Sequence, residues 1–301
     1  MQSRTLPKFA PAAQALACPA VAEDRTLRVA LAQVAPELGE VAGNARQVRD
    51  NIARAREEGA DLVVFPELTL SGYSIGLARD DVALSVDDPE LVGLAEGAVG
   101  LGCVVGFAEA GRVHTHNSAA YLERGAVRHV HRKLYLPTYD IWEERKHFTP
   151  GSAMRAFDTD VGRVAILICS DAWQPALAVV AIQDGARVLI VPANSTARRA
   201  ENRQDWHDVN RFCARQLECY VVFVNRVGEE GELSFWGGSH VYDPWGELVA
   251  EAPLDEPALL TAELDLAAVR RRRREMPLVK EARLALLSRE LERLSAEGGD
   301  L

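Results

Sequence analysis

Short apolar runs alternate with helical patterns along most of the chain. The β-branched and apolar runs at 61–65 and 164–168 predict strands that are buried on both faces, and similar runs at 27–34, 103–107, 187–191 and 220–225 predict further strands. Between them, residues 44–59, 91–99 and 205–218 carry apolar positions at helical spacing and predict helices. This alternation predicts an α/β fold with a mixed sheet.

Two other patterns punctuate this alternation. Residues 117–122 and 126–131 predict a hairpin around Gly125, and residues 132–151 form a long aromatic and charged loop without periodicity. A loop of that length inside a compact domain is usually functional or disordered, and its aromatic residues argue against disorder. Asn44 is the expected N-cap of the first helix, and residues 278–294 predict an amphipathic helix. Its apolar face carries Leu284, Leu287, Leu291 and Leu294.

The pattern shows no internal repeat and no linker. We therefore expect a single α/β domain over residues 26–295, followed by a short tail at 296–301. Residues 1–25 are Ala-rich but interrupted by prolines, so we expect a poorly ordered extension rather than an export signal.

Composition and charge narrow the function classes. The 44 acidic residues against 34 basic ones give a net charge of −10, which argues against a nucleic-acid partner. Five cysteines without a C-x-x-C pair indicate reduced thiols in a cytoplasmic protein. No apolar run is long enough to span a bilayer, so we expect no membrane partner.

The candidate nucleophile is Cys169, which ends the apolar run at 164–168 just before a helical pattern that begins near Pro175. A thiol on a tight turn between a strand and a helix lies near backbone N–H groups that stabilise a thiolate or an oxyanion. A cysteine alone is weak support, because free cysteines are among the most buried residues in protein cores.

Two other predicted strand ends carry charged residues that suit thiol chemistry on an amide. Glu67 follows the strand at 61–65, and Lys133 follows the second strand of the hairpin. A carboxylate can take the thiol proton and return it to the departing amine. The Lys133 ammonium and the backbone N–H of Ser170, directly after Cys169, can hold the oxyanion.

These residues carry a resemblance to a known family. The segments 65–68 (FPEL) with 71–73 (SGY), 131–133 (HRK) and 168–173 (ICSDAW) resemble the three signature regions of the nitrilase, or carbon–nitrogen hydrolase, superfamily. The resemblance implies a four-layer αββα sandwich with two mixed sheets between helices, usually dimerised. It also implies that Glu67 is the base, Lys133 the oxyanion stabiliser and Cys169 the nucleophile. The family's second glutamate maps best onto Glu144, which would orient Lys133 or the substrate, with Glu143 as the rival.

Within the superfamily, the segments 133–139 (KLYLPTY) and 144–151 (ERKHFTPG) are most similar to the glutaminase domain of glutamine-dependent NAD synthetase. Two features differ from that enzyme. The sequence contains no Ser-Gly-Gly-x-Asp-Ser loop of the ATP-dependent half, and Ser170 stands where those domains usually carry an acidic residue. These differences argue against glutamine as the substrate and against NAD synthesis by this chain alone.

Four further residues are candidates for lining the substrate pocket. They are Tyr139, Trp173, Asn194 and Trp236, and each has packing as its alternative role.

The sequence thus predicts a cytoplasmic thiol amidohydrolase that cleaves a non-peptide C–N bond of a small amide, without metal or cofactor, as a homodimer or higher oligomer. Alternatives within enzymes are a nitrile hydrolase, an N-carbamoyl amidohydrolase and a glutaminase that feeds ammonia to a separate synthetase. The alternative of another class is a non-catalytic binding or scaffold protein on the same fold.

Overall fold

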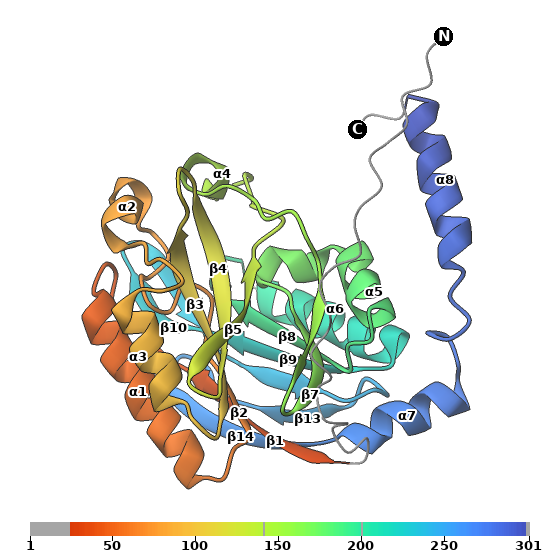
Figure 1. The fold of residues 1–301 in the computed structure, drawn as a ribbon, viewed down its shortest axis with the longest axis horizontal. Coiled ribbons are helices and arrows are strands. Elements are labelled where there is room, and N and C mark those ends of the chain that lie inside the picture. The colour runs from red at the N-terminus through yellow and green to blue at the C-terminus, as the bar shows by residue number, and fades with distance from the viewer. Residues whose placement is uncertain (1–24, 141, 200, 299–301) are drawn as a thin grey trace.

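Two six-stranded sheets pack face to face between helices in the computed structural model, which describes residues 25–140, 142–199 and 201–298 (Figure 1). Helices cover the outer face of each sheet, so the order of layers is helix, sheet, sheet, helix. The predicted αββα sandwich with two mixed sheets is confirmed. Among the described residues, no helix combines the length and the apolar character that crossing a membrane requires.

The first sheet takes its strands from the N-terminal half of the chain and one strand from near the C-terminus. Its outer face is covered by α1 (Val41–Glu57) and α3 (Pro89–Gly97), and the short α2 (Arg79–Val82) follows the 3-10 turn η1 (Gly76–Ala78). The strands lie in the order β14 (Ala258–Asp265), β1 (Thr26–Gln33), β2 (Leu62–Val64), β3 (Gly102–Ala110), β4 (Thr115–Glu123) and β5 (Ala126–Arg132).

The second sheet takes all its strands from residues 156–251. Its outer face is covered by α5 (Pro175–Gln183) and α6 (Asn202–Leu217). The strands lie in the order β13 (Leu248–Glu251), β12 (His240–Tyr242), β9 (Tyr220–Asn225), β8 (Val188–Ala193), β7 (Gly162–Ile166) and β6 (Ala156–Thr159).

The two sheets share one pairing pattern. Starting from β14 in one sheet and from β6 in the other, successive neighbours pair antiparallel, parallel, parallel, antiparallel and antiparallel. In each sheet, the parallel connections pass through the helices on the outer face. The two sheets therefore share a pairing pattern although the sequence shows no repeat, because strand pairing depends on backbone hydrogen bonds and tolerates different side chains.

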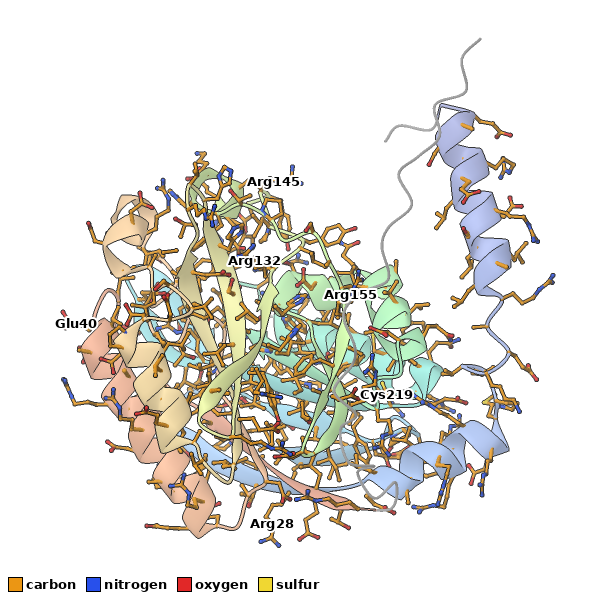
Figure 2. The ribbon with its side chains drawn as sticks, in the orientation of Figure 1. Arg28, Glu40, Arg132, Arg145, Arg155 and Cys219 are labelled. Carbon is orange, nitrogen blue, oxygen red and sulfur yellow. The ribbon has the colours of Figure 1, made fainter. Side chains whose placement is uncertain are left out.

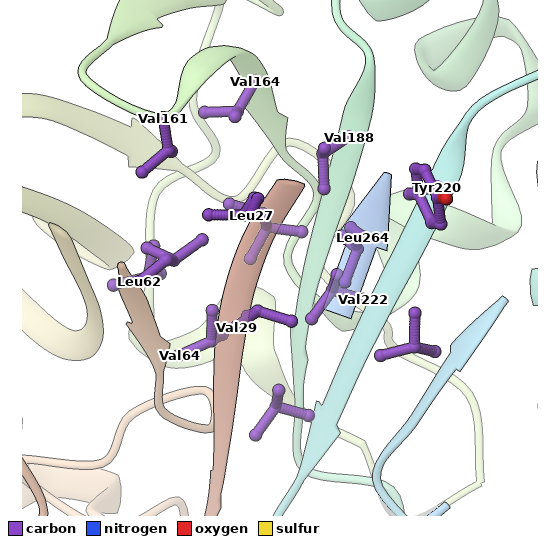
Figure 3. Packing of buried hydrophobic residues seen from close by; sticks show 14 of the residues in the cluster. Leu27, Val29, Leu62, Val64, Val161, Val164, Val188, Tyr220, Val222 and Leu264 are labelled. Atoms are coloured by element: carbon purple, nitrogen blue, oxygen red, sulfur yellow. The ribbon is translucent and has the colours of Figure 1, made fainter. Parts of the chain in front are cut away.

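A continuous apolar layer joins the facing sides of the two sheets (Figure 3). Leu27, Val29 and Val64 of the first sheet meet Val188 and Val222 of the second, and all five are at most 1% exposed. Alternate residues of the same strands point outward against the helices, which is why these strands are apolar throughout. The prediction that residues 61–65 and 164–168 form strands buried on both faces is confirmed.

The remaining elements lie at the margins of the sandwich. They are the hairpin of β10 (Val227–Glu230) and β11 (Leu233–Trp236), the turns α4 (Glu144–His147) and η2 (Cys169–Trp173), and the helices α7 (Leu266–Glu275) and α8 (Leu284–Ala296). Helix α8 extends away from the body and does not contact the sheets (Figure 2). Its leucines 284, 287, 291 and 294 are between 48% and 64% exposed.

Some local predictions differ from the structure. Helix α1 begins at Val41, so Asn44 lies inside the helix and is not its N-cap. The Asn44 amide instead bonds the backbone N–H and carbonyl of Glu37, at 2.8 and 2.7 Å. The predicted extension at 1–25 lies outside the described residues except for Arg25, and the bounds of the 26–295 domain stay a prediction.

Candidate active site

Three charged side chains from separate elements meet in the interior. Lys133, directly after β5, donates from Nζ to Glu67 Oε1 and to Glu144 Oε1, each at 2.7 Å. Glu67 lies on the loop after β2, and Glu144 begins α4. All three residues are at most 5% exposed. The structure thus brings together the predicted base, oxyanion stabiliser and auxiliary carboxylate, while their catalytic roles stay predictions.

Glu143, the alternative to Glu144 as the auxiliary carboxylate, lies away from Lys133. Glu143 is exposed and forms an ion pair with Lys146 on the surface of the same turn. Because α4 begins at Glu144, the two neighbouring carboxylates point in different directions, and only Glu144 contacts Lys133.

Both oxygens of the Glu67 carboxylate are fixed by neighbours. Asn117 Nδ2 donates to Oε1 at 2.7 Å, beside Lys133, and the backbone N–H of Asn194 donates to Oε2 at 3.0 Å. Gly106 of β3 packs directly under this loop, since a Cβ there would lie 2.4 Å from the backbone nitrogen of Leu68. The carboxylate is therefore held in one orientation by residues of both sheets.

Cys169 begins the turn η2, three residues after the last residue of β7. Its backbone has a φ of 47°, in the left-handed region that non-glycine residues seldom occupy. Such strained conformations concentrate at functional sites, where the surrounding structure enforces them. Cys169 is half-buried and lines a cavity together with Glu144 and Asn194.

The charges of this group act on one another strongly because water is excluded. Burial raises the pKa of the Cys169 thiol well above its ordinary range, the carboxylate of Glu67 raises this pKa further, and the Lys133 ammonium lowers it. Desolvation lowers the pKa of Lys133, but the carboxylates of Glu144 and Glu67 outweigh it and leave this pKa well above the ordinary value. The thiol is therefore protonated at rest and needs a base, whereas the lysine stays an ammonium.

The auxiliary carboxylate has a shifted pKa as well. Burial raises the pKa of Glu144 to about 7, although the Lys133 ammonium acts in the opposite direction. Tyr73 donates its hydroxyl to Glu144 Oε1 at 2.8 Å, and burial together with Glu144 raises the pKa of Tyr73 well above its ordinary value. Tyr73 is therefore a permanent donor to this carboxylate.

The cavity beside Cys169 has a volume of about 340 Å³. It is lined by three of the four predicted substrate-binding residues, Tyr139, Trp173 and Asn194, and by Ser170. Their roles in binding and in holding an oxyanion stay predictions. Both side-chain atoms Oδ1 and Nδ2 of Asn194 are buried without a hydrogen-bond partner among the described residues. A larger space of about 680 Å³ adjoins the cavity across Tyr73, Trp142 and Glu144.

Trp236 does not line this cavity. It is 5% exposed and packs against Phe223 in the layer under α5 and α6. Its indole Nε1 donates to Ser195 Oγ at 3.0 Å, so it supports the loop that carries Asn194. Trp236 therefore packs in the core, which was the alternative to a place in the substrate pocket.

Two residues in direct contact with the site carry no signal in the sequence that assigns them a role. Tyr73 belongs to a signature segment, yet nothing in the sequence shows that its hydroxyl reaches Glu144. Asn117 was detectable in principle, because the hairpin pairs Ser118 with Arg132 and so places residue 117 beside Lys133.

Comparison with known proteins decides the family. Residues 28–274 match the family model described as carbon-nitrogen hydrolase. The chain belongs to the carbon-nitrogen hydrolase family. The predictions of this superfamily and of an enzyme that hydrolyses carbon–nitrogen bonds other than peptide bonds are thereby confirmed.

Three relatives illustrate the range of this carbon-nitrogen hydrolase family. A glutamine-dependent NAD(+) synthetase of Thermotoga maritima is 31% identical over 80% of this chain and 42% of its own length. A protein named as a probable nitrilase of Schizosaccharomyces pombe is 28% identical over 79% of this chain and 88% of its own. The structure of an amidase from Nesterenkonia sp. superposes with a TM-score of 0.71 at 26% identity, over 83% and 94% of the two chains. This carbon-nitrogen hydrolase thus spans less than half the length of the synthetase it matches.

Proposed function

We propose that the protein is a thiol amidohydrolase, which cleaves a non-peptide C–N bond of a small amide through an acyl-thioester on Cys169. One observation carries the proposal. The ammonium of Lys133 bridges two buried carboxylates, those of Glu67 and Glu144, and Glu144 lines a cavity together with Cys169. A thiol, a base and a cation are the groups that amide cleavage needs.

In the first half-reaction, the Glu67 carboxylate takes the thiol proton while the Cys169 sulfur attacks the carbonyl carbon. The carbonyl oxygen becomes an oxyanion. Lys133 has three N–H donors, of which two hold carboxylates, so one remains for this oxyanion. The Ser170 backbone N–H is the second proposed donor, and one such donor is typically worth about 3–4 kcal/mol.

The intermediate then collapses. The C–N bond breaks, the amine leaves with the proton that Glu67 held, and the acyl group remains on sulfur as a thioester. In the second half-reaction, Glu67 takes a proton from water, whose oxygen attacks the thioester carbon. The C–S bond breaks, the carboxylic acid leaves, and the proton returns to Cys169. The net change is hydrolysis of one amide to an acid and ammonia or an amine.

Glu144 acts on Lys133 rather than on the substrate in this scheme. Its carboxylate and that of Glu67 hold Nζ from two directions, and the Tyr73 hydroxyl fixes Glu144 in turn. The ammonium is therefore aimed before the reaction begins, so that no reorientation is needed as the oxyanion forms.

The substrate is the open part of the proposal. The names of the relatives point to amides, nitriles and the amide of glutamine, and the aromatic cavity accommodates a small molecule of any of these classes. N-carbamoyl compounds remain a further alternative. The homodimer and the cytoplasmic location also remain predictions.

A screen for ammonia release tests the proposal. The panel contains glutamine, asparagine, ω-amides of dicarboxylic acids, N-carbamoyl amino acids and simple nitriles. We expect turnover of at least one amide, loss of turnover in Cys169→Ala, and normal turnover in Cys213→Ala, which changes a buried cysteine of α6. No turnover across the panel, or full activity of Cys169→Ala, would refute the proposal.

Labelling with iodoacetamide separates an enzyme from a scaffold. We expect Cys169 to react faster than the buried Cys213 and Cys219, and Glu67→Gln to slow its reaction. Equal rates at all three cysteines would favour the non-catalytic alternative.

A further inference from the structure

Asp171 lies two residues after Cys169, and its carboxylate is completely buried. Three backbone N–H groups and one histidine ring nitrogen converge on it. Oδ1 accepts from the backbone of Leu134 at 3.0 Å and of Tyr135 at 2.9 Å. Oδ2 accepts from the backbone of Ile168 at 3.2 Å and contacts His131 Nε2 at 3.1 Å. The acid is thus fully occupied by the protein and is not available to a substrate.

These bonds join the two segments that carry the candidate nucleophile and the candidate oxyanion donor. His131 and Leu134 flank Lys133 at the end of β5 in the first sheet. Ile168 directly precedes Cys169 after β7 in the second sheet. One carboxylate therefore ties together backbone that lies more than thirty residues apart in the chain, across the junction of the two sheets.

The same residue closes the turn around Cys169. The backbone N–H of Asp171 donates to the Ile168 carbonyl at 3.0 Å, while its carboxylate accepts from the Ile168 N–H. Both peptide groups of Ile168 are thereby held, just before the residue whose φ is 47°. Ser170 adds a bond from its hydroxyl to the Tyr135 carbonyl, on the segment that Asp171 also holds.

We propose that Asp171 is a positioning residue, whose carboxylate sets the placement of the Cys169 thiol and the Ser170 N–H relative to the Lys133 ammonium. The proposal deepens the function proposed above and rests on it for its catalytic meaning. Asp171 touches no reacting atom and acts only through the segments that it holds.

A carboxylate is required because every partner is able to donate. Asparagine has one acceptor oxygen and one NH₂ group, and that group would face the Ile168 N–H or the pair of N–H groups at Leu134 and Tyr135. Asp171→Asn therefore keeps the volume of the side chain, but its NH₂ group faces a backbone N–H group where the carboxylate oxygen accepted a hydrogen bond. The histidine ring can change tautomer, whereas the backbone N–H of Ile168 cannot.

The first test compares Asp171→Asn with the wild-type enzyme on the best amide of the screen. We expect kcat to fall about 10²-fold, because misplacement of reacting groups by about 1 Å costs that much, with KM changed less than about threefold. Asp184→Asn is the matched control, because Asp184 joins the Ala156 N–H and Arg163 at 2.8 and 2.9 Å outside the site. This control should keep the wild-type kcat.

The second test needs no substrate. The rate of Cys169 alkylation by iodoacetamide is measured against pH in both variants. If Asp171 positions Lys133 near the thiol, its loss weakens the cation's effect, so the alkylation midpoint of Asp171→Asn moves to higher pH and the rate at pH 8 falls about tenfold. A role in stability alone would leave the pH profile of the folded fraction unchanged.

A pair of His131 variants covers the case in which Asp171→Asn fails to fold. Glutamine keeps a donor near the position of Nε2, whereas leucine removes it. We expect His131→Leu to shift alkylation in the direction predicted for Asp171→Asn, and His131→Gln to restore most of the wild-type profile.

The positioning role would be overturned if folded Asp171→Asn, or both His131 variants, kept the kcat and the alkylation profile of the wild-type enzyme. Failure of the wild-type enzyme to turn over any amide would instead refute the proposed function. The alkylation comparison would still report on the placement of the thiol, so the two failures are distinguishable.

Discussion

Replacing Lys133 by methionine tests whether the buried ammonium holds two carboxylates together. The substitution keeps an unbranched stem of four atoms and removes the terminal ammonium that bonds Glu67 and Glu144 at 2.7 Å each. Both carboxyl groups then share a site in which each is at most 5% exposed. Their partners Asn117 and Tyr73 still donate to them but carry no charge.

The expected loss follows from the burial of the pair. Removing one partner of a buried ion pair typically lowers the free energy of unfolding by about 3–5 kcal/mol. We expect a loss in this range where both carboxyl groups are ionised. In Lys133→Met, burial and the Glu67 carboxylate raise the pKa of Glu144 without the opposing effect of the ammonium. The favourable contribution of protonated Glu144 is therefore present below its unfolded pKa and is lost as the pH rises through its folded pKa. We expect a loss of about 1–2 kcal/mol at pH 5 and about 3–5 kcal/mol at pH 8.

Urea unfolding followed by tryptophan fluorescence at pH 5 and pH 8 measures this difference. The matched control is Lys146→Met, because Lys146 pairs with Glu143 while the two side chains are 66% and 55% exposed. An exposed pair contributes little, so the control should change the unfolding free energy by about 0.5 kcal/mol at either pH. A loss in Lys133→Met that is equal at both pH values, or no larger than the control's, would refute the reasoning.

Two other substitutions test the site. Burial raises the pKa of Glu144 to about 7, so wild-type kcat/KM should fall as the pH drops through that value and Glu144 loses the charge that orients Lys133. Glu144→Gln should lower kcat/KM about 10- to 100-fold at pH 8 and abolish that acid limb; a limb unchanged in the variant would contradict this role. In Gly106→Ala, the added methyl would lie 2.4 Å from the Leu68 nitrogen, so we expect a loss of about 1–3 kcal/mol in urea unfolding and reduced turnover. Gly97→Ala, with nothing within 4 Å, is its control, and equal effects of the two would disprove the steric argument.

The apolar runs predicted most strands well, because buried strands leave runs that need no tertiary information, whereas the four layers were implied by the family resemblance. The runs at 61–65 and 164–168 appear as β2 and β7, and the hairpin appears as β4 and β5. The pairing pattern that the two sheets share was not predictable in this way, since the two sets of strands carry different side chains. Asn44 was assigned to the wrong position because a polar residue before a helix resembles a cap even when its amide bonds a neighbouring loop.

The candidate site was predictable as a set of residues but not as a geometry. Motif order named Glu67, Lys133 and Cys169, yet intervals of 66 and 36 residues say nothing about how one sheet lies on the other. The choice between Glu143 and Glu144 depended on where a one-turn helix begins in an aperiodic loop. Asp171 escaped notice because an acidic residue at a turn is usually solvated, and only coordinates show the three N–H groups and the ring nitrogen around it.

The candidate site draws its parts from both sheets, with Glu67 and Lys133 past the strands of one and Cys169 and Asn194 past the strands of the other. The apolar layer between the sheets resists separation but has little directional preference, so it opposes sliding weakly. The bonds from Asn194 to Glu67 and from Leu134 to Asp171 are directional and cross the same junction. The geometry of the candidate site thus depends on how the two sheets are aligned. Mild heat or pressure that shifts one sheet relative to the other would lower the activity while every strand is still intact.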